Sequence, residues 1–223
     1  MGRPARISRR KVAQVAIRLL DDEGVHALSL ERIASELGVR GPSLYHHFED
    51  KAAILDAVAQ TIIGRLTLEP QTEDWEEWII EISLEMYRRV TRHPNVAHLV
   101  LEHISPAAMI AGFGRAAVKV DRAGIPPERQ ILAIEGMHYI VWGFIMHRTI
   151  VGMHPLLQEP PDPRQWKELA AAHESNCLDD EQMLELAGRA FLAGVRDPRL
   201  ASPAPRPASP ARVVAGRGRV GAG

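Results

Sequence analysis

The 223-residue sequence contains a single cysteine, Cys177, so no disulfide can form within the chain. Disulfide-bonded scaffolds belong to oxidising compartments, and their exclusion here favours a reducing, cytoplasmic setting. The N-terminus carries arginines but lacks the apolar segment of a signal peptide. The longest unbroken apolar run, 139–146, is too short to span a bilayer, so we expect no membrane partner.

The alternation of apolar and polar residues that marks a half-buried strand is also missing. Apolar residues make up 46% of the chain and recur at helical spacing, which predicts an all-α globular fold with a sizeable core. Glycine, proline and polar residues separate the periodic segments. We expect helices at 8–24, 30–38, 42–48, 50–66, 75–93, 95–103, 106–123, 127–150, 164–175 and 179–196.

Composition divides the chain into three parts. Residues 1–66, with a basic arm at 1–10, form a small N-terminal unit, and a polar connector opens a larger unit at 67–197. Residues 198–223 are rich in proline, alanine, glycine and arginine without an apolar period, which predicts a disordered basic tail. Such a tail either attracts nucleic acid weakly or is simply solvated.

The net charge of −1 is unevenly distributed. It is +2 over 1–67, −8 over 68–197 and +5 over 198–223. The middle of the chain therefore repels polyanions, whereas both ends can approach them.

The two short helices expected at 30–38 and 42–48 are joined by a tight turn, which is the arrangement of a helix-turn-helix. Leu44 and Phe48, four residues apart, are expected to anchor the second of these helices and leave its polar side chains outward. We expect an N-terminal three-helix helix-turn-helix domain whose outward residues face double-stranded DNA: Arg40, Gly41, Pro42, Ser43, Tyr45, His46 and Lys51.

The chemistry of these residues suits that role. Arg40 can form a bidentate pair with guanine, and Ser43 can bond a base edge or a phosphate. Tyr45 and His46 combine a polar tip with an apolar ring that can contact a thymine methyl group. Gly41 and Pro42 lack bulk and allow a close approach, while Lys51 suits a phosphate contact. The arginines of the N-terminal arm could reach a minor groove.

The stretch "ALSLERIASELGVRGPSLYHHFEDKAAILDAV" resembles the N-terminal signature of the tetracycline-repressor-like (TetR) family of bacterial transcriptional regulators. The resemblance covers about residues 8–66 and extends more weakly to a tetracycline-repressor-type C-terminal domain. It implies an all-helical homodimer that presents one recognition helix per subunit, here 42–48, to a palindromic operator. It also implies a repressor, not an enzyme, that leaves DNA when a small apolar or amphipathic effector binds the C-terminal domain.

The chain departs from the family pattern at two positions. Glu31 stands where close relatives carry a basic residue that helps read the operator, so the operator sequence cannot be carried over. Val100 stands where tetracycline-binding members carry a histidine that takes part in drug–metal binding. This argues against the same magnesium–drug chelate.

Aromatic residues and methionines lie among polar residues on the helices of the larger unit. Such a mixture is typical either of an apolar cavity with a few polar anchors or of an ordinary core, and the resemblance favours the cavity. Arg115 and His147 are further polar residues on these helices. The candidate ligand-binding residues are Trp78, Met86, His98, Glu102, His103, Met109, Phe113, Met137, His138, Trp142 and Met146. The histidines lack metal-ligand spacing, so we expect no metal and no cofactor.

A dimer surface is expected from 128–150 and 179–196. The second segment combines small residues, which permit close helix approach, with apolar ones: Leu184, Ala187, Gly188, Ala190, Phe191, Ala193, Gly194 and Val195. The alternative is that both segments complete the core of the monomer.

Two other functions remain open on the residues alone. One is a helical-bundle carrier or enzyme without DNA binding, although no catalytic motif is present in the sequence. The other is a regulator that responds to a protein partner or to no ligand. Salt-dependent DNA binding separates the first from a regulator.

Overall fold

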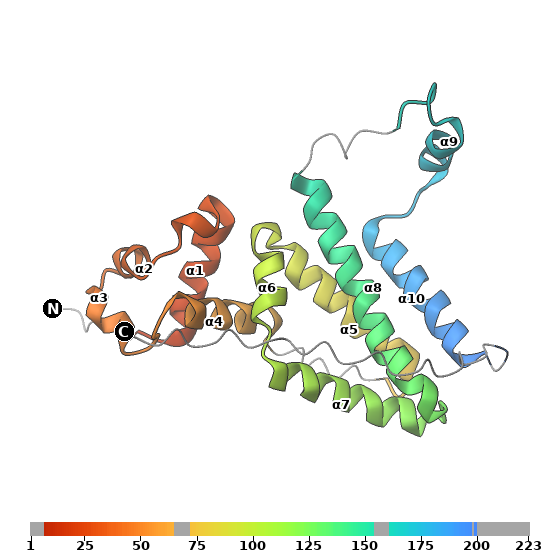
Figure 1. Ribbon diagram of the computed structural model, residues 1–223, viewed down its shortest axis with the longest axis horizontal. Coiled ribbons are helices and arrows are strands. Elements are labelled where there is room, and N and C mark those ends of the chain that lie inside the picture. Colours follow the sequence, from red (N-terminus) through yellow and green to blue (C-terminus); the bar gives the residue numbers. More distant parts are fainter. Residues whose placement is uncertain (1–6, 65–71, 154–160, 198, 200–223) are drawn as a thin grey trace, which may run out of the picture.

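The computed structural model describes residues 7–64, 72–153, 161–197 and 199, and every regular element within them is helical (Figure 1). The expected all-α fold is therefore confirmed. Residues 1–6 of the basic arm, most of the connector and all of the expected tail except Arg199 lie outside the described residues.

No single helix in the described ranges has the length and apolar composition of a membrane span. One pair of helices, Pro94–His103 and Pro106–Arg122, meets that test only when taken together, and it is bent by 87°.

The N-terminal helices begin and end where short-range chemistry dictates. Helix α1 (Arg9–Glu23) begins after Ser8, whose hydroxyl accepts a hydrogen bond from the Lys11 N–H, and the 3₁₀ turn η1 (Val25–Ala27) follows it. Helix α2 (Leu30–Leu37) is capped in the same way by Ser29, and it ends at Gly38, whose φ of 65° lies in the left-handed region that favours glycine. Asp50 caps α4 (Lys51–Ile63).

The expected recognition helix is shorter than predicted. Helix α3 spans Gly41–Tyr45 and does not continue to Phe48. The N–H groups of His47 and Phe48 both donate to the Leu44 carbonyl, which tightens the chain into a turn immediately after α3. The helix ends early because the following residues have other roles. Phe48 is buried in the core, and Asp50 caps α4.

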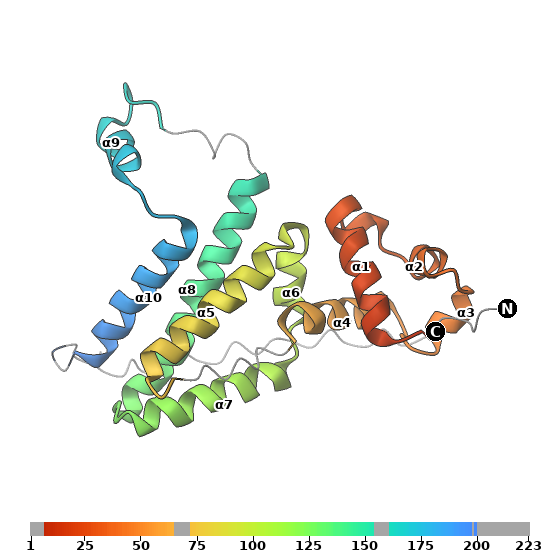
Figure 2. The ribbon, with the colours of Figure 1, turned by 180° about the vertical axis from the view of Figure 1, so that it is seen from behind.

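The larger part of the chain is a bundle around one long helix. Helix α8 (Pro127–Met153) packs against α5 (Trp75–Thr91), α7 (Pro106–Arg122) and α10 (Asp180–Arg196). Helix α6 (Ala97–His103), reached through the 3₁₀ turn η2 (Pro94–Val96), lies between this bundle and α4 (Figures 1 and 2). We call α1–α3 the head and α5–α10 the body, and α4 contacts both.

Part of the expected dimer surface is core of the monomer instead. Leu184 and Val195 of α10 are buried, and Gly188 packs closely on α5 and α8. A Cβ atom at Gly188 would lie 2.6 Å from Ile80 Cδ1 and 2.7 Å from Met137 Cε, so only glycine fits without displacing those side chains. The small residues Ala187, Ala190 and Ala193 remain exposed on the opposite face of α10.

Helix α9 (Lys167–Ser175) projects away from the rest of the body (Figures 1 and 2). Only Ala170 of this helix is buried, whereas Trp166 and Leu169 are more than half exposed. The neighbouring chain segment 154–160 lies outside the described residues.

The burial of Leu44 is expected to hold α3 in place. Replacing this fully buried side chain by alanine, Leu44→Ala, should lower the free energy of unfolding by about 2–5 kcal/mol, because it leaves a cavity under the short helix. Urea unfolding measures the loss. The control Ile110→Ala removes a side chain that is 69% exposed and should change stability by less than about 0.5 kcal/mol. Equal losses in the two variants would contradict this packing.

Candidate nucleic-acid interface and adjoining pocket

The tip of the head exposes most of the residues expected to contact DNA. Tyr45 is 52% exposed, and the side chains of Arg40 and His46 are also exposed. On the opposite side of α3, Leu44 and Phe48 are buried in the core of the head. The short helix therefore presents a polar edge on an apolar base.

The remaining members of the expected set lie at the start of α3. Pro42 is exposed in its first turn, while Gly41 and Ser43 are half-buried. The Arg40 side chain makes no capping bond at this helix start, Pro42 has no N–H, and the Ser43 N–H donates to the Arg40 carbonyl at 3.0 Å. A phosphate or base edge can approach there without displacing a cap.

Two basic residues expected to contact DNA have partners inside the protein. The Lys51 ammonium donates to the Val25 carbonyl at 2.9 Å. Arg9 Nη1 donates to the His47 carbonyl at 2.7 Å, and its guanidinium carbon lies 4.5 Å from the centre of the Phe48 ring. These contacts tie α1 and α4 to the turns that flank α2 and α3. In this structure both residues position the reading helix.

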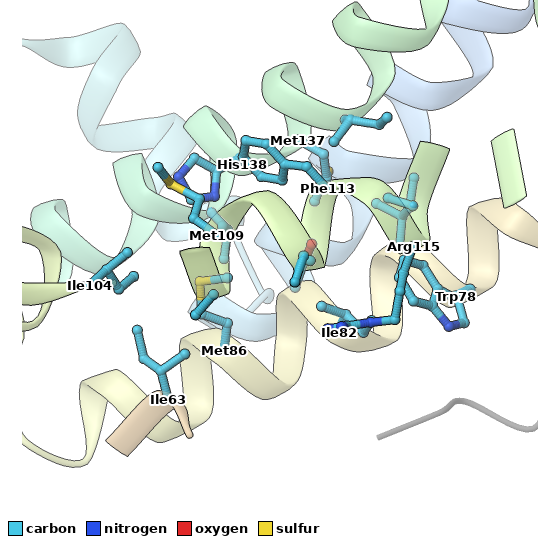
Figure 3. A pocket seen from close by; sticks show the side chains of 18 of the residues that line it. Ile63, Trp78, Ile82, Met86, Ile104, Met109, Phe113, Arg115, Met137 and His138 are labelled. Atoms are coloured by element: carbon cyan, nitrogen blue, oxygen red, sulfur yellow. The ribbon is translucent and has the colours of Figure 1, made fainter. Parts of the chain in front are cut away.

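A pocket of about 290 Å³ opens between α5, α7 and α8 and reaches the ends of α4 and α6 (Figure 3). Its volume lies near the lower end of the range for small-molecule sites. Its lining is mostly apolar: Ile63, Gly64, Trp78, Ile79, Ile82, Ser83, Met86, Ile104, Ala108, Met109, Ala111, Gly112, Phe113, Arg115, Ala116, Ile134, Met137, His138 and Val141.

Six of the eleven predicted ligand residues line this pocket: Trp78, Met86, Met109, Phe113, Met137 and His138. All six lie on α5, α7 or α8, and the faces of these helices that meet in the body can be recognised from their apolar spacing. The sequence analysis therefore found residues on all three principal walls.

The other five predicted ligand residues lie outside the pocket. On α6, Leu99 and Val100 face the core, so His98 and Glu102 point to solvent. The five are His98, Glu102, His103, Trp142 and Met146. His103 pairs with Asp56, and Trp142 is buried beside His138.

Sequence reasoning missed the residues that the ends of α4 and α6 contribute to the pocket. Ile63 and Gly64 come from α4 and Ile104 from the end of α6, and no local pattern shows that these segments meet. Arg115 was recognised as a polar residue on an interior helix, but it was not chosen. The sequence did offer a signal for Arg115. It lies two residues after Phe113 in a stretch of the helix that is otherwise apolar.

Two histidine–aspartate contacts join the head and α4 to the body. His103 Nδ1 lies 2.7 Å from Asp56 Oδ1, which links α6 to α4. His93 Nδ1 lies 2.7 Å from Asp21 Oδ2, and the Asn95 amide donates to the Asp21 carbonyl at 2.9 Å. Because Ile104 follows His103 and lines the pocket, the α4–α6 link lies directly beside the cavity.

Residues 13–58 match the model of the family described as "Bacterial regulatory proteins, tetR family". This segment contains α2, α3 and most of α1 and α4. Residues 13–58 therefore form a tetR-family domain. The resemblance noted in the sequence is thereby confirmed.

Curated relatives include tetracycline repressors. The class D repressor of Escherichia coli is 31% identical over 100 residues, which cover 44% of this chain and 46% of that protein. The match thus spans about half the length of that relative. The class G repressor of Vibrio anguillarum is 23% identical over 163 residues, covering 70% of this chain and 76% of the relative.

Solved structures of TetR-family proteins share the fold over most of their length. ActR of Streptomyces coelicolor in complex with (S)-DNPA has a TM-score of 0.65 at 22% identity, covering 86% of this chain and 98% of ActR. TetR of Acinetobacter baumannii has a TM-score of 0.67 at 19% identity, covering 86% and 97%. At these identities the structures establish the fold of this chain, and its activity has to be argued from its own residues.

The pKa of His138, which lines the pocket, is shifted from its ordinary value. Burial lowers the pKa of the imidazole, and the nearby Glu135 carboxylate only partly opposes this effect. The ring makes edge-to-face contacts with Phe113, at 5.2 Å between centroids, and with Trp142, at 6.2 Å. His138 is therefore a neutral hydrogen-bonding group at pH 7 within an aromatic cluster.

The lowered pKa of His138 predicts a loss of stability in acid. As pH falls below 6.5, the unfolded chain binds a proton at this residue before the folded chain does. The contribution of His138 to the free energy of unfolding is therefore lost. We expect the stability advantage of the parent protein over His138→Gln to be smaller at pH 5 than at pH 7, as measured by urea unfolding. An advantage that stays constant or grows at pH 5 would contradict a buried neutral imidazole.

Proposed function

We propose that this protein is a transcriptional repressor that binds operator DNA as a homodimer and is released when a small molecule occupies the pocket. The observation that carries the proposal is the position of α4. This helix packs on the head that presents α3, and its last residues line the pocket. A ligand there contacts the same helix that supports the reading head.

The family match supports the DNA-binding half of the proposal. In a helix-turn-helix, the second helix enters the major groove with its N-terminal residues toward the bases. Here that helix is α3, and Arg40, Ser43, Tyr45 and His46 are placed to meet bases and phosphates. Such a protein works where the chromosome is, which places it in the bacterial cytoplasm.

An unpaired apolar face supports the homodimer. On α8, Ile131 and Tyr139 are each at least 60% exposed, and on the neighbouring α10 Leu186 is 53% exposed beside the small residues Ala187 and Ala190. Two such faces can pack as a four-helix interface between subunits. A two-fold dimer would present two heads, which predicts a palindromic operator.

The pocket supports control by a small molecule. Solved relatives include ActR in complex with actinorhodin and a variant of A. baumannii TetR in complex with minocycline. In this chain, no three His, Cys, Asp or Glu side chains come together as metal ligands in the described ranges, and the proposal involves no metal or cofactor. Release requires that the ligand bind the released state more tightly than the DNA-bound state.

The contacts around α4 offer a structural basis for this difference in ligand affinity between the released and DNA-bound states. An occupant in contact with Ile63 and Ile104 presses on the ends of α4 and α6, which the Asp56–His103 bond ties together. A shift of α4 would tilt the head and change the separation of the two reading helices. Packed helices move as units, so a small displacement at the pocket reaches α3.

DNA binding is tested with a duplex selected from random sequence by the purified protein. Tyr45→Ala should weaken binding to this duplex by about 1–3 kcal/mol, because it removes a base-reading contact, and binding should fall steeply with salt. Gel-shift titration measures both effects. The control Trp166→Ala removes an aromatic residue of similar exposure at the N-cap of α9, away from the head, and should leave affinity unchanged.

If no duplex is selected, the result favours a helical-bundle carrier without DNA binding. If a duplex is selected but Tyr45→Ala binds it as tightly as the parent, α3 is not the reading helix.

The link between α4 and α6 is tested by a double-mutant cycle. Asp56→Ala and His103→Ala should each change operator affinity by up to about 1 kcal/mol, and the double variant should add little, because each change breaks the same contact. The control is the Arg88–Glu181 pair, an ion pair of 2.7 Å between α5 and α10 inside the body. Its removal should leave operator affinity unchanged. Additive effects at Asp56 and His103 would contradict the coupling.

A further inference from the structure

Arg115 is the one permanently charged side chain among the residues that line the pocket. The other lining residues are apolar except for Ser83 and His138, and burial lowers the pKa of His138 so that it is neutral at pH 7. Among the described residues, Arg115 has no hydrogen-bond or ion-pair partner and no acidic side chain lines the pocket. Its guanidinium is therefore available to a ligand.

An available cation beside an apolar cavity selects the charge of its occupant. A cationic ligand would be repelled, and a wholly apolar one would leave the exposed guanidinium to water and gain nothing from its charge. A carboxylate is favoured instead, since its two oxygens match two N–H groups of guanidinium. Arg115 is exposed, which keeps this contribution moderate, because solvent screens the pair.

The aromatic residues of the pocket select the shape of the occupant. Phe113 and His138 meet edge to face, with their rings 84° apart, so the pair offers both a ring face and a ring edge. Aromatic ligands gain from either geometry. Met86, Met109 and Met137 fill the space around the pair with flexible side chains that can adapt to a flat molecule.

The charged group and the coupling residues lie at different ends of the pocket. In Figure 3, Arg115 and Trp78 lie on one side of the view, and Ile63 and Ile104 lie on the other, with Met86 and Met109 toward that second side. A ligand anchored at Arg115 can therefore extend its apolar body toward the ends of α4 and α6. This orientation places the uncharged end of the ligand beside the α4–α6 link.

We propose that the effector is a flat aromatic carboxylic acid whose carboxylate pairs with Arg115 and whose rings lie against Phe113 and His138. This inference rests on the proposed function, because it names the ligand class of the same pocket. It goes further in assigning the charge of the ligand, its orientation and the residue that selects it.

The test uses three probes: anthracene-9-carboxylate, the neutral anthracene-9-carboxamide, and dodecanoate as an acid without rings. Calorimetric titration of the full chain should show the aromatic acid binding about tenfold more tightly than its amide at low salt, with the advantage shrinking as salt is raised. Arg115→Gln should weaken binding of the acid about tenfold and binding of the amide less than twofold.

Arg122→Gln is the matched control. It lies on the same helix, is exposed and does not line the pocket, so it should leave the affinity for each probe unchanged. Thermal unfolding of both variants establishes that they are folded before binding is compared.

Four outcomes would overturn the inference. They are an amide that binds as tightly as the acid, an Arg115→Gln change that weakens both probes equally, dodecanoate binding as tightly as the aromatic acid, and no binding of either anthracene probe. The gel shift with ligand-free protein distinguishes these failures from a failure of the proposed function. A chain that binds its selected duplex but not the probes keeps the repressor assignment and loses the effector class. A chain that binds the acid through Arg115 but no duplex loses the repressor assignment.

Discussion

Helix α4 packs against α1 in the head and against α6 in the body, so two parts of the molecule share one rigid element. Its buried residues, Ile54, Leu55, Ala57, Val58, Ala59 and Ile62, surround most of the helix, as expected for an element covered on several sides. A change in the position of this helix at the pocket would therefore alter its contacts with the head as well. The proposed switch follows from this constraint, because the last residues of α4 belong to the pocket wall.

Basic residues in the head divide between structural contacts and the proposed contact with DNA. Arg9 and Lys51 donate to backbone carbonyls and fix the turns around α2 and α3, while Arg40 is exposed beside the reading edge. The body carries a net charge of −8 over residues 68–197, which disfavours contact with a polyanion except through the head. Charge distribution and packing thus favour the same orientation on DNA, with the tip of α3 leading. In the proposed effector site, one guanidinium without a partner among the described residues likewise favours a carboxylate.

Local chemistry made most of the fold predictable. Ser8, Ser29 and Asp50 each mark a helix start because a side-chain oxygen there accepts a backbone N–H, and Gly24 and Gly38 mark helix ends through positive φ angles. Long-range geometry was not predictable in this way. The carbonyl partners of Arg9 and Lys51 lie 38 and 26 residues away, so the sequence suggested DNA contacts for both. The pocket was found where interior helix faces meet, but its α4 and α6 ends depend on how separate segments pack. The packing of α6 also explains why His98 and Glu102 point to solvent.

The central claim is that a ligand in the pocket changes the structure or stability of α4. Amide hydrogen exchange, measured with and without saturating anthracene-9-carboxylate, tests it directly. The account predicts that exchange rates change in peptides from the pocket walls and also in peptides covering 51–63 of α4 and 97–103 of α6. A change confined to α5, α7 and α8, with α4 and α6 unaffected, would contradict it, because the ligand would then fill the cavity without reaching the helix that supports the reading head.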